Sequence, residues 1–377
     1  MKIGFVSLMR VADWGGSEEL WSKTALRALN EGFEIESLTF GWNPTSSRIA
    51  KLQQAGVDTK FYHSNSAAKI DRILVRLGVK KGRSETTPSM DSDIYVISNG
   101  NIWDFLRLKP ITDYIISLGK PYVIIGHNTL DWGDILDSEQ RAYAITVMQN
   151  AARVLFVSER NRKGAERQLA HLIPNTQIVS NPLSTRNNSI KPFPASDTLL
   201  MASVGTLDCV TKGQDLLLEA LSGEAWKGRD FVLKIYGRGH HEQYLNTLIE
   251  LYGLQGKVIL AGHVSDVDQI WEINQVLVLS STTEGVPMVV VEAMLSGRAV
   301  LGTDVGAVDQ YVKEGETGFL VAVAKAKYLA QGLEKLWDSR NTLKQMGESA
   351  FQRAVAITNA HPEESFLGII KSCVHPS

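Results

Sequence analysis

This chain of 377 residues has little of several features that define particular protein classes. Its two cysteines, Cys209 and Cys373, lie far apart and in no Cys/His metal spacing, which argues against a disulfide framework or a zinc site. No apolar run reaches the length of a membrane-spanning helix, and residues 1–10 are too short an apolar run for a signal peptide. A net charge of −2 offers no general attraction to nucleic acid. We expect a cytoplasmic protein that binds no nucleic acid.

Short apolar runs alternate with helix-length amphipathic segments along the chain. Residues 17–32 and 213–223 are predicted helices, because apolar residues recur at three- and four-residue spacing and a glycine ends each segment. The runs rich in Val and Ile are predicted strands: 2–8, 35–41, 94–98, 121–127, 153–158, 199–205, 231–237, 257–262, 275–280 and 299–304. Strands alternating with helices indicate an α/β fold with parallel sheets covered on both faces.

The length of the chain suits two domains. The segment Asn181–Asp197 contains three prolines and no periodicity, which is typical of a linker. We therefore expect two doubly wound, Rossmann-like domains at residues 1–185 and 199–350, with a linker at residues 186–198. In such folds ligands bind beyond the carboxyl ends of the strands, where loops lead into helices.

One of these junctions carries two glutamates, Glu284 and Glu292, at the start of a predicted helix that begins at Pro287 and is closed by Gly297. The amides of residues 285–288 would point out of the helix N-terminus, a usual site for a phosphate. Both carboxylates would be repelled by a phosphate, so they should accept hydrogen bonds from sugar or ribose hydroxyls. In the alternative reading Glu284 is an ordinary loop acid and Glu292 faces solvent, but apolar residues surround Glu292.

Two further junctions fit a phosphate ligand. Lys212 stands just before the predicted helix 213–223, where its ammonium could reach a phosphate; a lysine that serves solubility is the alternative. Gly15 and Gly16 allow a close backbone approach, and Ser17 can cap the helix that follows, although an ordinary turn would look the same.

Two other motifs are interpreted as weak or structural. Residues 237–239 read Gly-Arg-Gly, but His240 and His241 follow, so the dinucleotide fingerprint is incomplete. The triplet Asp91–Asp93 resembles a metal-binding DxD, yet it precedes a strand instead of following one, and we expect a turn.

Together these residues resemble the retaining glycosyltransferases of family 4. The resemblance rests on EGVPMVVVEAM at 284–294, VGTLDCVTKGQDLLLEAL at 204–221, GGSEE at 15–19, IVSNP at 178–182 and GTDVGAVDQYVKEGETGFLV at 302–321. It implies the GT-B fold, in which two Rossmann-like domains face each other across a cleft. The N-terminal domain would bind the acceptor and the C-terminal domain the nucleotide sugar. Residues 351–377, from about Ala350 on, would return to the first domain.

The resemblance also implies roles for particular residues. Glu292 would hold the donor ribose and Glu284 the transferred sugar, while Lys212 would neutralise the diphosphate. Gly16 would let the N-terminal loop close on the donor, and His127 would reach the sugar from the opposite domain. The implied catalytic residues are Glu284, Lys212 and His127, and the implied donor-binding residues are Gly15, Gly16, Thr206, Lys212, Gly237, Val264, Glu284, Gly285, Val286, Pro287, Met288 and Glu292.

Some positions depart from the family pattern. Thr206 stands where the family has an arginine that contacts phosphate, and Arg10 and Arg238 are candidate replacements by sequence position. A Gly-Ala pair, Gly306-Ala307, replaces the family's Gly-Gly, and Asp309 replaces a frequent glutamate. These departures imply weaker or differently arranged diphosphate binding.

The expected activity is a metal-independent, retaining hexosyl transfer from a nucleotide-diphosphate sugar, with UDP-glucose or a close relative as donor and no cofactor. The expected acceptor is a saccharide or lipid-linked saccharide of cell-surface polysaccharide synthesis; a soluble sugar phosphate is the alternative. No carboxylate nucleophile is evident, which fits a front-face mechanism in which the leaving phosphate accepts the acceptor's proton. Rival functions are a nucleotide-sugar epimerase, a dinucleotide oxidoreductase and a donor-binding protein without turnover.

Residues 69–83 form a predicted helix with an apolar stripe and many basic residues. Such a segment in the acceptor-binding domain would contact an anionic membrane or a lipid diphosphate, and would place the protein at the inner face of the membrane. A helix that packs on its own domain is the alternative.

Overall fold

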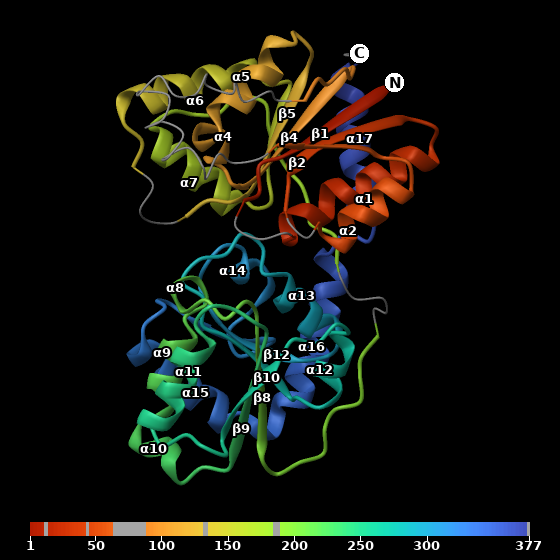
Figure 1. Ribbon diagram of the computed structural model, residues 1–377. Coiled ribbons are helices and arrows are strands. Elements are labelled where there is room, and N and C mark those ends of the chain that lie inside the picture. Colours follow the sequence, from red (N-terminus) through yellow and green to blue (C-terminus); the bar gives the residue numbers. More distant parts are fainter. Residues whose placement is uncertain (11–13, 43–44, 63–87, 131–134, 184–188, 375–377) are drawn as a thin grey trace, which may run out of the picture.

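The computed structural model describes residues 1–10, 14–42, 45–62, 88–130, 135–183 and 189–374, so the predicted amphipathic segment 69–83 lies outside the described residues. Figure 1 shows two units, each with a sheet flanked by helices, stacked one above the other. All paired strands are parallel within the described residues. The predicted α/β class with two doubly wound sheets is confirmed. Within the described chain, no helix combines the length and apolar character needed to cross a membrane.

The first sheet has the strand order β3-β2-β1-β4-β5-β6-β7. Its strands are β1 (Lys2–Ser7), β2 (Glu34–Phe40), β3 (Asp58–Tyr62), β4 (Ile94–Asn101), β5 (Tyr122–Asn128), β6 (Arg153–Phe156) and β7 (Thr176–Ile178). Its helices are α1 (Gly16–Asn30), α2 (Ser47–Gln54), α4 (Asp104–Arg107), α5 (Lys109–Ser117), α6 (Ser138–Asn150) and α7 (Glu159–Leu169). Strand β5 is buried at six of its seven residues, as expected where helices cover both faces.

The second sheet has the order β10-β9-β8-β11-β12-β13. Its strands are β8 (Leu199–Val204), β9 (Phe231–Tyr236), β10 (Val258–Gly262), β11 (Val276–Leu279), β12 (Ala299–Thr303) and β13 (Gly318–Val321). Its helices are α8 (Cys209–Lys212), α9 (Gln214–Leu221), α10 (Glu224–Lys227), α11 (Glu242–Leu251), α12 (Asp268–Glu272), α13 (Met288–Leu295), α14 (Val308–Tyr311), α15 (Ala326–Asp338), η1 (Arg340–Thr342) and α16 (Leu343–Ile357).

Every predicted strand is present, and α1 and α9 lie where helices were predicted. The sequence missed β3, β7 and β13. Strand β7 has only three residues and none of them is buried, so it carries no hydrophobic signal. The triplet before β4 forms a bend, in which the Asp93 carboxylate accepts a hydrogen bond of 2.8 Å from the Lys2 amide.

The C-terminal helices divide between the two units. Helix α16 packs against α13 and β12 of the second sheet. Helix α17 (Pro362–Val374) instead packs against α1, where Phe366 and Ile370 join the core of the first unit (Figure 1). The chain therefore passes to the first unit between α16, which ends at Ile357, and α17. The domain limits themselves stay a prediction.

The described segment 189–197, before β8, is held by one buried arginine, Arg298. Its guanidinium is fully buried and donates to backbone carbonyls, among them those of Pro192 and Trp271. Burial without a carboxylate partner lowers the pKa of Arg298 to about 10, so it remains charged at neutral pH. The segment is thereby tied to the second unit.

Candidate functional site

The loop between β11 and α13 lies at the carboxyl end of its sheet, and it holds the predicted Glu284. The Lys212 ammonium at the end of α8 donates to Glu284 Oε1 over 2.6 Å, and the Ser281 hydroxyl donates to the same oxygen over 2.7 Å. The structure thus brings two predicted catalytic residues together as a direct ion pair. The sequence did not predict this pairing, because it assigned the two residues to different parts of the donor.

Helix α13 begins at Met288, with Pro287 as its N-cap, one residue later than predicted. Gly297 follows the helix with a positive φ of 75°, in agreement with its predicted closing position. Glu292 is only 5% exposed, which contradicts the alternative of a solvent-facing residue. Lys23 of α1 lies close enough to act on it electrostatically. Burial lowers the pKa of the Lys23 ammonium, and the negative charges of Glu363 and Glu292 offset part of that decrease.

His127 is the penultimate residue of β5 and is buried. Its Nδ1 lies 3.1 Å from Asn181 Oδ1, so Nδ1 carries the proton and donates; Nε2 lies 3.5 Å from the Ser98 hydroxyl. Burial lowers the pKa of His127 to about 4, although the Asn181 bond offsets part of this shift. The ring is therefore neutral at physiological pH, and both ring contacts are made within the first unit.

The two units meet at the predicted site. The carbonyl oxygen of His127 lies so close to Gly285 that a Cβ on this glycine would be 1.9 Å from it. Gly306 packs behind the same loop with φ +56°, and a Cβ there would be 2.3 Å from the Gly285 carbonyl oxygen. The Arg160 guanidinium of α7 forms an ion pair of 2.7 Å with Asp304, which follows β12. Only glycine fits at positions 285 and 306, because three backbone segments converge there.

The remaining predicted donor residues occupy loops at the same ends of the two sheets. Gly15 is the N-cap of α1 and Gly16 its first residue. Ser17 does not cap the helix as predicted; it lies inside α1, and its hydroxyl donates to Glu18. Thr206 is exposed, and Val264 packs beside the core under α13.

Three other residues named by the sequence analysis are Gly237, Arg10 and Arg238. Gly237 has no room for a side chain, because a Cβ would be 1.9 Å from the Gly205 carbonyl oxygen. The Arg10 guanidinium lies 5.4 Å from the Phe40 ring centroid, and Arg238 is exposed. The role of these two arginines as replacement cations stays a prediction.

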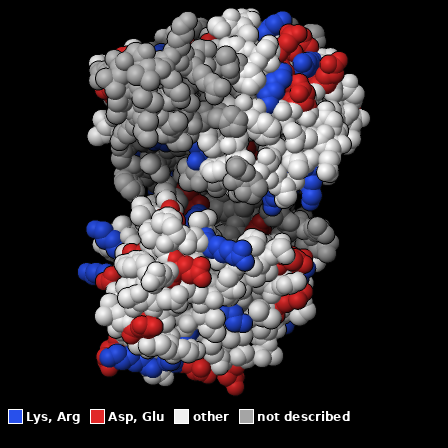
Figure 2. Space-filling model, viewed as in Figure 1, with Lys and Arg blue, Asp and Glu red and all other residues white. Residues whose placement is uncertain are grey.

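A cavity of about 660 Å³ opens between the two units. The first unit contributes Lys23, Arg48 and Lys51, and the second contributes residues 265–268 directly after Val264. Figure 2 shows a recess between the two halves of the molecule, with charged side chains at its visible rim. This cavity has the dimensions of a ligand site.

Sequence reasoning missed a buried carboxyl group in the first unit. Glu18 is 4% exposed and accepts hydrogen bonds from the Ser7 hydroxyl at 3.1 Å and from the Trp21 indole at 2.7 Å. Burial raises the pKa of Glu18 above its ordinary range, against the effect of these hydrogen bonds. The only sequence signal was GGSEE itself, in which two glutamates stand in the first turn of a helix.

Comparison with known proteins finds this chain similar to glycosyltransferases. Residues 185–353 match the family described as glycosyl transferases group 1. An uncharacterized glycosyltransferase of Haemophilus influenzae is 24% identical over 355 residues, which cover 93% of this chain and 94% of that protein. Alpha-D-kanosaminyltransferase of Streptomyces kanamyceticus is 25% identical over 215 residues, or 54% of this chain and 55% of that enzyme.

Solved structures agree over the whole chain. HepE of Anabaena, in complex with UDP and glucose, superposes with a TM-score of 0.74 at 16% identity and covers 99% of this chain and 100% of its own. Sucrose-phosphate synthase of Thermosynechococcus elongatus gives 0.73 at 15% identity, with 100% of both chains covered. The chain has the GT-B fold. The family and sequence matches support a glycosyltransferase. The narrower assignment to the retaining enzymes of family 4 stays a prediction.

Proposed function

We propose that this protein is a retaining glycosyltransferase that moves a sugar from a UDP-sugar, with UDP-glucose or a close relative as donor, to a saccharide acceptor. The observation that carries the proposal is the Lys212–Glu284 pair, held where the Gly285 loop of one unit meets His127 of the other. A cation for the diphosphate and a carboxylate for sugar hydroxyls then stand side by side at the contact between the units.

Charged groups and hydrogen-bond donors of the second unit would bind the nucleotide sugar. Lys212 would move from Glu284 to the diphosphate, while the amides at the start of α13 add backbone donors and the favourable end of the helix dipole. Glu284 would then accept from the transferred sugar. The buried carboxylate of Glu292, inside α13, would accept from the ribose hydroxyls.

The chemistry we infer is transfer with retention, in which negative charge grows on the leaving diphosphate and Lys212 stabilises it. His127 is neutral, because burial lowers its pKa to about 4, and it is suited to hydrogen bonding but not to acting as a charged acid. Gly285 and Gly306 let the loops close tightly, which would exclude water from the reacting carbon. We infer a front-face course, in which the leaving phosphate takes the proton of the acceptor hydroxyl.

The acceptor would bind at the carboxyl ends of β1 and β2. A small pocket of mixed polar and apolar lining lies there beside Glu18 and Thr39, with room of about 10 Å³, enough for one hydroxyl group or one water. Thr39 is 4% exposed, and its hydroxyl has no partner among the described residues. Phe40 and Trp42, with ring centroids 5.0 Å apart, form the apolar wall. We propose that one hydroxyl of an acceptor sugar enters this pocket and that its ring packs on Trp42.

Two features of related proteins support the choice of donor and pathway. HepE was solved with UDP-glucose, and one curated relative is named a putative colanic acid biosynthesis glycosyltransferase, WcaL of Escherichia coli, 32% identical over 130 residues. We propose a cytoplasmic enzyme of cell-surface polysaccharide synthesis, with membrane contact through residues 69–83 and domain limits at residues 185, 198 and 350. No cofactor enters the proposed transfer.

The experiment that tests this function is thermal unfolding with UDP, GDP, ADP and their glucose conjugates, because a ligand of the folded state raises its melting temperature. Two variants accompany the wild type: Glu292→Gln keeps the side-chain volume and removes the charge, and Glu250→Gln alters an exposed glutamate of α11 as a matched control. We expect a shift with the uridine series, reduced in Glu292→Gln and kept in the control. A wild type that responds to no nucleotide would contradict the proposal.

Turnover is tested separately by UDP release from UDP-glucose with phenyl glycosides as surrogate acceptors. Thr39→Val, which keeps the shape and removes the hydroxyl, should raise the KM for the acceptor and leave the KM for the donor unchanged. Equal effects on both constants would place the pocket outside the acceptor site. Donor binding without UDP release would favour the donor-binding protein over the transferase.

A further inference from the structure

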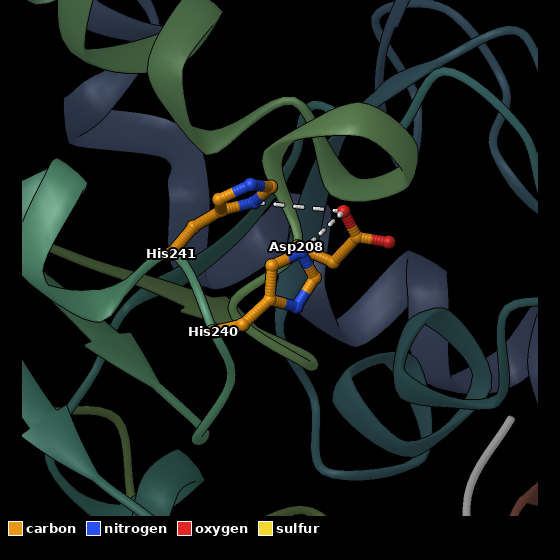
Figure 3. Close-up of side chains that lie close together, drawn as sticks. All are labelled: Asp208, His240 and His241. Carbon is orange, nitrogen blue, oxygen red and sulfur yellow. Dashed lines mark ion pairs between the residues drawn. The ribbon is translucent and has the colours of Figure 1, made fainter.

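The Gly-Arg-Gly loop after β9 is followed by two histidines to which the proposed transfer assigns no role. In the folded chain, His240 and His241 meet Asp208 of the loop after β8, and one ligand atom from each of the three lies within 4.8 Å of the others. Figure 3 shows both rings next to the carboxylate of Asp208. It is the one group of this kind found among the described residues.

The distances within the cluster fit a shared ion better than direct bonds. Asp208 Oδ1 lies 3.6 Å from His241 Nδ1 and 4.0 Å from His240 Nε2. Both separations are too long for hydrogen bonds. Two ligand atoms of a tetrahedral zinc site are about 3.4 Å apart, given Zn–N and Zn–O distances near 2.1 Å. A small inward movement of the exposed His240 ring would complete a three-ligand shell.

Backbone hydrogen bonds hold the loop after β8 against the loop after β9. The Leu207 amide donates to the Arg238 carbonyl oxygen over 3.0 Å, and the His241 amide donates to the Leu207 carbonyl oxygen over 3.2 Å. Gly239 is required at this crossing, because a Cβ would be 2.4 Å from the Leu207 carbonyl oxygen. The ligands are therefore carried by backbone that is positioned before any ion binds.

Two of the three atoms that would bind the ion already accept backbone hydrogen bonds, one on Asp208 and one on His241. Asp208 Oδ2 accepts from the Thr211 hydroxyl at 2.8 Å, and Oδ1 accepts from the Val210 amide at 3.2 Å as the N-cap bond of α8. A carboxylate oxygen has a second lone pair, so Oδ1 can bind an ion and keep this bond. The His240 side chain is 70% exposed, and its ring makes no hydrogen bond within the described part of the chain. His241 Nδ1 accepts from the Cys209 amide at 3.0 Å, so an ion bound at this nitrogen would replace that bond.

We propose that Asp208, His240 and His241 bind a divalent transition metal ion of the Zn²⁺ type. Two imidazoles and one carboxylate favour such an ion over Mg²⁺ or Ca²⁺, which prefer oxygen ligands. With three protein ligands, a fourth position stays open to water or to an anionic ligand. Asp208 is also the N-cap of α8, which ends at Lys212, so the ion would stiffen the loop that carries the Lys212–Glu284 pair.

The test is calorimetric titration of the nucleotide-free protein with ZnCl₂, with MgCl₂ as the comparison ion, so that its result does not depend on the proposed transfer. Two variants remove ligands: His240→Gln alters an exposed ring, and Asp208→Asn removes the charge but keeps a good N-cap residue. His361→Gln is the matched control, because His361 is also exposed and lies 3.7 Å from Glu363.

We expect one zinc ion per chain in the wild type and in His361→Gln, with no saturable binding of Mg²⁺. Affinity should fall at least about tenfold in His240→Gln and in Asp208→Asn, since losing even an outer partner of a metal ligand costs that much. Absence of zinc binding by the wild type would overturn the proposal. Unchanged zinc affinity in His240→Gln would also overturn the proposal, because it would show that the ion binds another group, such as Cys373.

Discussion

The Lys212 ammonium and the Glu284 carboxylate form an ion pair of 2.6 Å, and both side chains are largely shielded from solvent. Two groups proposed to bind different parts of one donor thus neutralise each other in the free protein. Donor binding must exchange this pair for contacts with the diphosphate and the sugar.

The first prediction follows from this exchange. Glu284→Gln frees the positive charge of Lys212, so the affinity for UDP should rise about three- to tenfold, as expected for one partly shielded ion pair. The rate of transfer should fall at least about tenfold, because a charge-assisted hydrogen bond to the sugar is lost. Calorimetry with UDP and an assay of UDP release measure the two effects. An unchanged or weaker UDP affinity would contradict the role of the pair.

The second prediction concerns Gly285, where a Cβ would be 1.9 Å from the His127 carbonyl oxygen and 3.4 Å from Val157. Gly285→Ala forces the two units apart, so small-angle scattering should report a larger radius of gyration and transfer should drop strongly. Gly228→Ala is the control, since no atom lies within 4 Å of its added methyl group. If Gly285→Ala keeps the dimensions and activity of the wild type, the close contact is not needed for transfer.

The third prediction concerns the Arg160–Asp304 ion pair between the units. Both side chains are more than a third exposed, so a double-mutant cycle with Arg160→Gln and Asp304→Asn should give a coupling of about 0.5–1 kcal/mol in kcat/KM. High salt should abolish this coupling, because it screens exposed charges. Additive effects of the two substitutions at low salt would show that the pair does not assist closure.

The fourth prediction concerns pH and His127, whose pKa burial lowers from the ordinary 6.5 to about 4. Between these values the unfolded chain binds a proton that the folded chain does not, so acidification favours unfolding. The wild type should lose on the order of 2 kcal/mol of unfolding free energy between pH 7 and pH 5 through this residue. His127→Gln lacks this titrating group, so its unfolding free energy should fall by that much less over the same pH range. Urea unfolding at both pH values measures the difference. An identical loss in both proteins would exclude a buried, neutral His127.

Much of the fold was predictable, because parallel strands buried on both faces leave a clear hydrophobic signal. Strand β5 is an example, since its apolar run coincides with six buried residues. Strand β7 is the opposite case: its residues are not buried, and only its backbone pairing with β6 makes it a strand. The cap of α1 was predicted wrongly, because Ser17 forms its hydrogen bond with Glu18 instead of with the helix backbone.

The sequence by itself determined the two doubly wound sheets and the burial of Glu292, since both depend on apolar residues that are neighbours along the chain. The tertiary structure alone decided that Lys212 pairs with Glu284, that Arg160 reaches Asp304, and that Asp208 meets two histidines. These contacts join residues that lie far apart in the chain and come together only where strands end at the same edge of a sheet or where the two units touch. Local periodicity carries no information about such distances, so they follow from the packing of the whole molecule.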